Sequence, residues 1–235
     1  MINSKKILAI IPARGGSKRL SRKNILNLAG KPLICWTIEA ALNSKYIDKL
    51  IVSSEDEEIL EIAKKSGAEI LVRPKELATD EAKIIDVVFH VLKNIEENFD
   101  IIILLQPTSP LRESKHIDEA LNLLIKKDAN AIVSVCEAEH NPLWCNTLPE
   151  DGSMKNFLRK DIINRRSQDL EKYYRLNGAI YICKTEKLLV EQSFFLEDNI
   201  YAYIMDRKSS VDIDDEVDFK LAEILIKAKY DGFSL

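Results

Sequence analysis

Residues 6–24 read KILAIIPARGGSKRLSRKN, an apolar run that passes into a basic loop. Positions 7–11 are apolar and favour a strand, and Pro12 closes the run. The loop then holds two adjacent glycines (Gly15, Gly16), a hydroxyl donor (Ser17) and five basic residues (Arg14, Lys18, Arg19, Arg22, Lys23). Glycine allows close backbone approach and positive φ, so that successive N–H groups can converge on one anion. The stretch therefore predicts a buried strand that leads into a phosphate-binding loop.

This loop matches neither of the common phosphate motifs. The spacing G-x-x-x-x-G-K-[ST] is absent, because residues 15–18 read only GGSK, and G-x-G-x-x-G is also absent. The alternative interpretation is a basic surface turn after the first strand. The position of the loop favours ligand binding, because ligands of open α/β sheets bind beyond the carboxyl ends of strands.

The composition is that of an ordinary globular chain: 235 residues, 46% hydrophobic and 31% charged. A formal charge of −4 gives no general attraction to nucleic acid. The four cysteines include no C-x-x-C pair, so we expect buried thiols in a reducing cytoplasm and no zinc site or disulfide framework. The polar residues 1–6 and the short apolar run after them predict no signal peptide, and no run is long enough for a membrane span. We therefore expect a cytoplasmic protein without nucleic-acid or membrane partners.

Strand and helix patterns alternate along the first 135 residues. Strands are predicted near 50–53, 70–72, 100–105 and 131–135, and helices over 33–43, 56–65, 81–97 with Asp80 as N-cap, and 114–127. The run at 100–105 is continuously apolar, as in a central parallel strand that is covered on both faces. The order predicts an α/β fold with a doubly wound, mostly parallel sheet.

The alternation breaks between Glu137 and Leu176, a segment of polar turns and clustered charges. We interpret residues 137–176 as an insertion with short strands of its own, inside one domain over residues 1–235. After it, strands are predicted at 177–182 and 200–204, and helices at 186–192 and 216–229.

Three loops are expected to meet at one edge of the sheet: the basic loop, residues 106–112 and the acidic turn at 212–215. Asp212 and Asp214 are two residues apart, so in an extended segment both point to one side. Two carboxylates opposite a triphosphate suit Mg²⁺, which takes one or two carboxylates together with phosphate oxygens and water. The alternative is that Asp214 or Asp215 only caps the following helix. The absence of G-x-S-x-G gives no indication of a covalent nucleophile.

Five segments in order resemble the CMP-sialic acid synthetases (acylneuraminate cytidylyltransferases). They are residues 10–24 (IIPARGGSKRLSRKN), 71–80 (LVRPKELATD), 105–112 (LQPTSPLR), 177–181 (NGAIY) and 210–214 (SVDID). The resemblance implies a Rossmann-like nucleotidyltransferase fold, with the inserted segment forming a homodimer and part of the sugar pocket. It also implies an enzyme that transfers CMP from CTP to the anomeric 2-hydroxyl of a nonulosonic acid, with release of pyrophosphate.

The resemblance also implies roles for particular residues. The triphosphate-binding positions, with the two loop glycines, are Arg14, Gly15, Gly16, Ser17, Lys18 and Lys23, and those around cytosine and ribose are Asn24 and Arg73. Asp212 and Asp214 match the metal ligands, so that with Arg14, Lys18 and Lys23 they form the expected catalytic set. The sugar acid is expected at Gln106, Arg166, Arg175, Tyr181, Phe194 and Phe195, some of them reaching across the dimer. A metal-bound water or an aspartate could accept the proton, and this stays open.

Several alternatives remain at this point. Trp144 and Glu171 depart from residues common in the family at positions that face the sugar, so the acceptor is expected to be sialic acid first and legionaminic acid or another bacterial analogue second. A second enzyme class is a sugar-1-phosphate nucleotidyltransferase. A third reading is a regulatory module that binds CTP without turnover.

Overall fold

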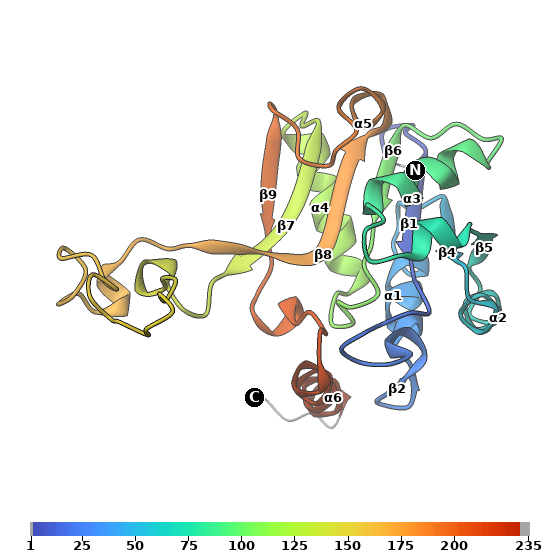
Figure 1. Ribbon diagram of the computed structural model, residues 1–235. Coiled ribbons are helices and arrows are strands. Elements are labelled where there is room, and N and C mark those ends of the chain that lie inside the picture. The colour runs from blue at the N-terminus through green and yellow to red at the C-terminus, as the bar shows by residue number, and fades with distance from the viewer. Residues whose placement is uncertain (1, 231–235) are drawn as a thin grey trace.

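The computed structural model describes residues 2–230, so residue 1 and residues 231–235 of the predicted domain lie outside the described part. Seven strands form one sheet in the order β5-β4-β1-β6-β8-β7-β9 (Figure 1). Their bounds are β1 Ile7–Pro12, β4 Lys49–Ser54, β5 Glu69–Val72, β6 Ile101–Leu104, β7 Ala131–Glu137, β8 Tyr174–Lys184 and β9 Ile200–Ile204. β8 is antiparallel to both β6 and β7, while the other strands run parallel to one another. The prediction of a doubly wound, mostly parallel sheet is confirmed, with β8 as its exception.

Helices cover both faces of this sheet. They are α1 Leu33–Leu42, α2 Glu57–Lys65, α3 Ile84–Lys93, α4 Ser114–Lys126, α5 Thr185–Glu191 and α6 Glu216–Tyr230. Buried residues of α1, α2 and α4 belong to one apolar cluster, and those of α3 and α5 belong to a second. The two clusters are the two sides of the core.

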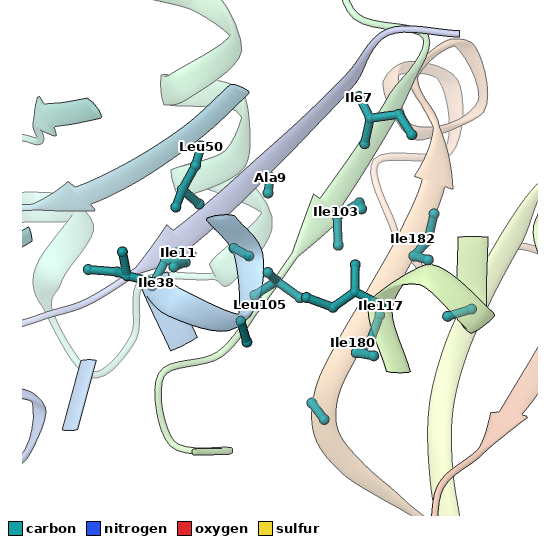
Figure 2. Close-up of a cluster of buried hydrophobic side chains, with 14 of the residues drawn as sticks. Ile7, Ala9, Ile11, Ile38, Leu50, Ile103, Leu105, Ile117, Ile180 and Ile182 are labelled. Carbon is teal, nitrogen blue, oxygen red and sulfur yellow. The ribbon is translucent and has the colours of Figure 1, made fainter. Parts of the chain in front are cut away.

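The central strands supply both clusters because their side chains alternate. Ile7, Ala9 and Ile11 of β1 lie in the first cluster, shown in Figure 2, whereas Leu8 and Ile10 lie in the second. β6 alternates in the same way and is buried along its whole length. A strand covered on both faces needs apolar residues at every position, which explains the continuous runs in the sequence.

The helix expected over residues 81–97 is shorter than predicted. α3 begins at Ile84 and ends at Lys93, and its N-cap is Lys83 instead of Asp80. Asp80 forms ion pairs with Arg14 and Lys18, at N–O distances of 2.9 and 2.5 Å. The carboxylate is thus held by the basic loop, three residues before the position that a cap would occupy.

The segment between β7 and β8 projects from the body of the fold as an arm (Figure 1). Its backbone is described throughout residues 138–173 and contains the 3-10 helices Pro142–Trp144 and Ser167–Asp169 but no strand, so the expected internal strands are wrong. The β character belongs instead to β7 and β8, whose pairing extends to Glu137 and Tyr174 at the base of the arm.

The last helix is anchored beside a small hairpin of β2 (Asn27–Leu28) and β3 (Lys31–Pro32). A third apolar cluster joins Ala222 and Ile226 of α6 to Leu28, Leu33 and Ile213. Ile213 is fully buried there, so the residues on either side of it are fixed in place.

Two expectations concern the whole chain. Within residues 2–230, no helix has both the length and the apolar character that a bilayer crossing requires. The four cysteines are free thiols, and Cys35, Cys136 and Cys183 are buried as expected, while Cys145 is exposed on the arm.

Candidate active site

A cleft of about 700 Å³ lies at the carboxyl ends of β1 and β6, where the strand order reverses. Eight of the residues predicted for the site line this main cleft: Arg14, Ser17, Lys18, Lys23, Asn24, Arg73, Gln106 and Asp214. The segment before α3 closes another side with Leu77, Thr79, Asp80 and Ala82. The structure therefore brings most of the predicted nucleotide-binding residues into one cleft.

The three predicted loops meet here through direct contacts. Arg19 pairs with Asp214 at 3.0 Å, and the Lys23 Nζ lies 3.7 Å from Asp214 and donates to the Ile213 carbonyl. The Ile213 N–H donates to the carbonyl of Thr108 at 2.8 Å, which connects the acidic turn to the loop after β6. The expectation that the three loops meet at one edge of the sheet is confirmed.

The glycines of the basic loop work differently from the expectation. Neither Gly15 nor Gly16 has positive φ, and Arg22 instead takes the left-handed conformation, with φ of 55°. Gly15 is required by close approach, since a Cβ there would lie 2.4 Å from Asp56 Oδ2. Its N–H donates at 2.7 Å to a carboxylate of the protein, that of Glu55.

One of the five loop cations does not line the main cleft. Arg22 turns away to form ion pairs with Asp56 and Glu58, both at 2.5 Å. These contacts attach the loop to the start of α2, because Asp56 is also the N-cap of that helix.

Arg73 forms a buried ion pair with Glu55, whose carboxylate accepts from Nε and Nη2 at 3.2 and 3.0 Å. Arg73 is only 5% exposed, and burial lowers the pKa of its guanidinium despite the opposing effect of Glu55. Sequence reasoning missed Glu55. It directly follows β4 at the carboxyl edge of the sheet, so the rule that located the other loops also indicates this residue.

Asp212 is more buried than Asp214 and lies beside Gly178, in the stretch of β8 where the pairing with β7 shifts register. Gly178 has φ of 70°, and a Cβ there would lie 3.1 Å from both Asp212 Oδ2 and Gln106 Oε1. A side chain at this position would therefore separate the carboxylate from the amide. Asn177 fixes this stretch of β8, because its Nδ2 donates to Ser210 Oγ at 2.9 Å and its Oδ1 accepts from Ser134 Oγ at 2.6 Å.

The environment of Asp212 suits a cation. Burial raises the pKa of its carboxyl group, and the nearby charge of Asp214 acts in the same direction, against a hydrogen bond from Thr108. Its Oδ1 is buried without a hydrogen-bond partner in the described chain. An orphaned, partly desolvated carboxylate oxygen is what a divalent cation would satisfy.

Residues 2–230 contain no cluster of three or more metal-ligating side chains. A metal at Asp212 and Asp214 would thus need oxygens from phosphate and water, in keeping with the usual Mg²⁺ site beside a nucleotide. The alternative, that an aspartate of this turn only caps the following helix, applies to Asp215. Asp215 Oδ1 accepts from the N–H groups of Val217 and Asp218 at 2.8 and 3.1 Å at the start of α6.

A smaller pocket of about 220 Å³ adjoins the main cleft, and Ile84 and Gln106 line both. Three of its walls are aromatic: the Tyr181 ring lies 6.0 Å from that of Phe194 and 6.1 Å from that of Phe195, between centroids. We call this the aromatic pocket. It brings together four of the six residues predicted for the sugar acid.

The other two predicted sugar residues lie elsewhere in this chain. Arg175 forms a bidentate pair with Glu139 at 2.9 and 2.7 Å, which lowers the pKa of that carboxyl group to about 2. Arg166 lies exposed on the arm and lines neither the main cleft nor the aromatic pocket. Within a single chain, therefore, Arg166 is not part of the site.

The sequence profile of the cytidylyltransferase family matches residues 8–227. The chain belongs to this family. The N-acylneuraminate cytidylyltransferase of Escherichia coli O18:K1:H7 is 42% identical over 217 residues, which are 92% of this chain and 51% of that protein. The chain thus spans about half the length of such relatives. These similarities confirm the family that the five segments indicate.

Other relatives match this cytidylyltransferase over nearly their whole length. The CMP-N,N'-diacetyllegionaminic acid synthase of Legionella pneumophila is 37% identical, with 94% of this chain and 97% of that protein covered. The pseudaminic acid cytidylyltransferase of Campylobacter jejuni is 36% identical, with 97% and 99% covered.

Solved structures share the fold. A CMP:2-keto-3-deoxy-manno-octonic acid synthetase complexed with CTP superposes with a TM-score of 0.71 at 19% identity, over 95% of this chain and 99% of that one. A cytidylyltransferase from Leptospira borgpetersenii gives a TM-score of 0.60 at 18% identity, with 97% and 95% covered. They support the Rossmann-like nucleotidyltransferase architecture predicted from the sequence.

Proposed function

We propose that this cytidylyltransferase transfers CMP from CTP to the anomeric 2-hydroxyl of a nonulosonic acid, in a Mg²⁺-dependent reaction that releases pyrophosphate. The observation that carries the proposal is one cleft with a basic loop on one side, Asp214 on the other and an aromatic pocket alongside, while the buried carboxylate of Asp212 lies two residues before Asp214. The names of the relatives point to 2-keto sugar acids as acceptors. Sialic acid is our first choice and legionaminic acid or another bacterial analogue is our second.

The roles of the residues follow from the charge of the reactants. Phosphoryl transfer needs charge neutralisation and in-line positioning more than covalent help. Arg14, Ser17, Lys18 and Lys23 would hold the triphosphate and stabilise the pyrophosphate as it leaves. Asn24 and Arg73 would border the base and ribose, and Gln106 would orient the sugar acid.

Asp212 and Asp214 would hold the Mg²⁺, which when bound neutralises phosphate charge. The acceptor oxygen forms its bond to the α-phosphorus as the bond to the pyrophosphate oxygen breaks. The hydroxyl proton leaves to a base that this arrangement does not single out.

A substrate panel tests the proposal. Purified protein, CTP and Mg²⁺ should release pyrophosphate with sialic or legionaminic acid and not with sugar 1-phosphates. Turnover of a sugar 1-phosphate alone would assign the competing enzyme class. CTP binding in a calorimeter without turnover of any of several nonulosonic acids would instead support a regulatory module.

We also propose that the arm of residues 137–176 forms a homodimer interface and completes the sugar pocket of a second copy. Leu148, Met154 and Ile163 are 56–60% exposed on the arm, which has too few neighbours to bury them. Arg166 would reach a site only if that site belonged to the partner.

We also propose that the protein works in the cytoplasm. The four cysteines are free thiols, which suits a reducing compartment.

Replacing Met154 and Ile163 together by Asp should give a monomer by light scattering, because burying two carboxylates in an apolar interface is unfavourable. The matched control is Val190→Asp, which changes an 80% exposed residue on α5 and should leave the dimer intact. A dimer that survives the double substitution would contradict the assigned interface.

A further inference from the structure

The basic residues around the site differ in whether an acid already neutralises them. Every one that lines the main cleft has an acidic partner: Arg14 and Lys18 pair with Asp80, Arg19 and Lys23 with Asp214, and Arg73 with Glu55. The aromatic pocket has one basic residue in its lining, Lys83. Among residues 2–230, the Lys83 ammonium has neither an ion pair nor a hydrogen bond with any side chain or carbonyl.

Lys83 lies next to the boundary between the main cleft and the aromatic pocket, where an acceptor would bind. It is the N-cap of α3, so its neighbour Ile84 lies on the boundary that the aromatic pocket shares with the main cleft. Gln106 lies on the same boundary, and its amide oxygen and a carboxylate oxygen of Asp212 both lie beside Gly178. A sugar whose reacting hydroxyl lies at this boundary and whose apolar substituent lies among the rings would therefore lie beside Lys83.

The charge of the reactants indicates a role for Lys83 in binding the acceptor. A nonulosonic acid carries a carboxylate, and it must enter beside a triphosphate and the carboxylates of Asp212 and Asp214. Repulsion among these anions disfavours binding of the acid unless a cation compensates for its charge. The cations of the main cleft are shared between internal acids and the triphosphate. Within one chain, Lys83 is the cation of the aromatic pocket that remains for the acceptor.

We propose that Lys83 is a specificity-determining residue whose ammonium pairs with the carboxylate of the acceptor acid. The inference rests on the proposed function. It means that the aromatic pocket selects a sugar that combines an apolar substituent with an acid group. Neutral sugars of similar size would leave the ammonium without a partner and gain nothing from it.

Steady-state kinetics of Lys83→Ala and Lys83→Arg tests this inference. Lys83→Ala should raise the KM for the acid by about tenfold or more, as the loss of one charge-assisted contact implies. The KM for CTP and the kcat at saturation should stay within about twofold, because the pairing is made equally in the ground and transition states. Lys83→Arg should keep most of the affinity, since its charge remains.

A modified acceptor identifies the group that Lys83 contacts. The methyl ester of the acid carboxylate removes the negative charge of the same contact, whereas Lys83→Ala removes the positive charge. Wild-type protein should lose a similar factor in kcat/KM with the ester, and Lys83→Ala should lose little more, as in a double-mutant cycle. The matched control is Lys75→Ala, an exposed lysine in the same segment that lines neither cavity.

The outcomes separate the two proposals. If wild-type protein turns over no nonulosonic acid, the proposed function fails, and the acceptor contact of Lys83 fails with it. If wild-type protein is active and Lys83→Ala has an unchanged KM for the acid, the inference about Lys83 alone is wrong. It is also overturned if the KM for CTP rises instead, or if the substitution and the ester act additively.

Discussion

Asp212→Asn should lower kcat by at least about a thousandfold, the scale of losing a group that stabilises charge in the transition state. The carboxylate Oδ1 is buried without a partner, and the substitution removes the charge that would hold a cation while it preserves the shape. Initial rates of pyrophosphate release at saturating CTP and acceptor, measured over a series of Mg²⁺ concentrations, check the expectation. A rate close to wild type at low Mg²⁺ would remove Asp212 from the metal site.

The same substitution should not weaken the fold. The pKa of Asp212 is raised by burial, so at neutral pH its ionised form costs free energy in the folded state when no cation is bound. This cost disappears as pH falls through the raised pKa. The free energy of unfolding of Asp212→Asn at pH 7 without metal should thus equal or exceed that of the wild type, as urea denaturation would show.

Asp215→Asn is the matched control within the same turn. Asp215 caps α6 through two N–H groups, and asparagine caps a helix about as well as aspartate. We expect near-normal turnover and stability. An equal loss of activity in both variants would show that any change to the turn is disruptive.

Arg14→Ala should reduce kcat/KM for CTP by a factor on the order of a hundred or more, because a preorganised donor to the transferring phosphates is lost. Arg14 lies at the carboxyl end of β1 and contacts the opposite wall through Asp80 at 2.9 Å and the Thr79 carbonyl at 3.1 Å. The side chain is 35% exposed, so the fold should keep nearly all of its stability. Kinetics with varied CTP and a thermal melt of the same sample measure both effects.

Arg22→Ala is the comparison that separates the effect of the position of Arg14 in the main cleft from the effect of losing one positive charge in the loop. Arg22 belongs to the same loop and carries the same charge, but it contacts Asp56 and Glu58 outside the main cleft. Its removal should leave the KM for CTP within a few-fold of wild type. Equal effects of the two substitutions would mean that the loop acts through its total charge, and the assignment of Arg14 would fail.

The sequence predicted the core because burial on both faces constrains every residue of a strand. The runs in β1 and β6 have no polar position, and they become neighbouring strands in the interior of the sheet. The meeting of the basic loop with Asp214 was predictable from a second rule. The carboxyl ends of parallel strands share one edge, wherever their residues stand in the chain.

Other features depend on contacts that a sequence pattern does not contain. Alternation of side chains is the same in either direction, so nothing local indicates that β8 runs antiparallel. Asp80 has the position of a helix cap and is instead held by two cations from residues 14–18. Lys83 resembles any solvated lysine at the start of a helix until the pairing of all its basic neighbours is known.

The pairing of four cleft cations with only two carboxylates sets a charge threshold for ligands. Asp80 holds Arg14 and Lys18, and Asp214 contacts Arg19 and Lys23. A monoanion that displaced one of these carboxylates would exchange one ionic contact for another and gain little. A triphosphate with several charges on one chain can displace both carboxylates at once, which favours CTP over singly charged anions through multivalency.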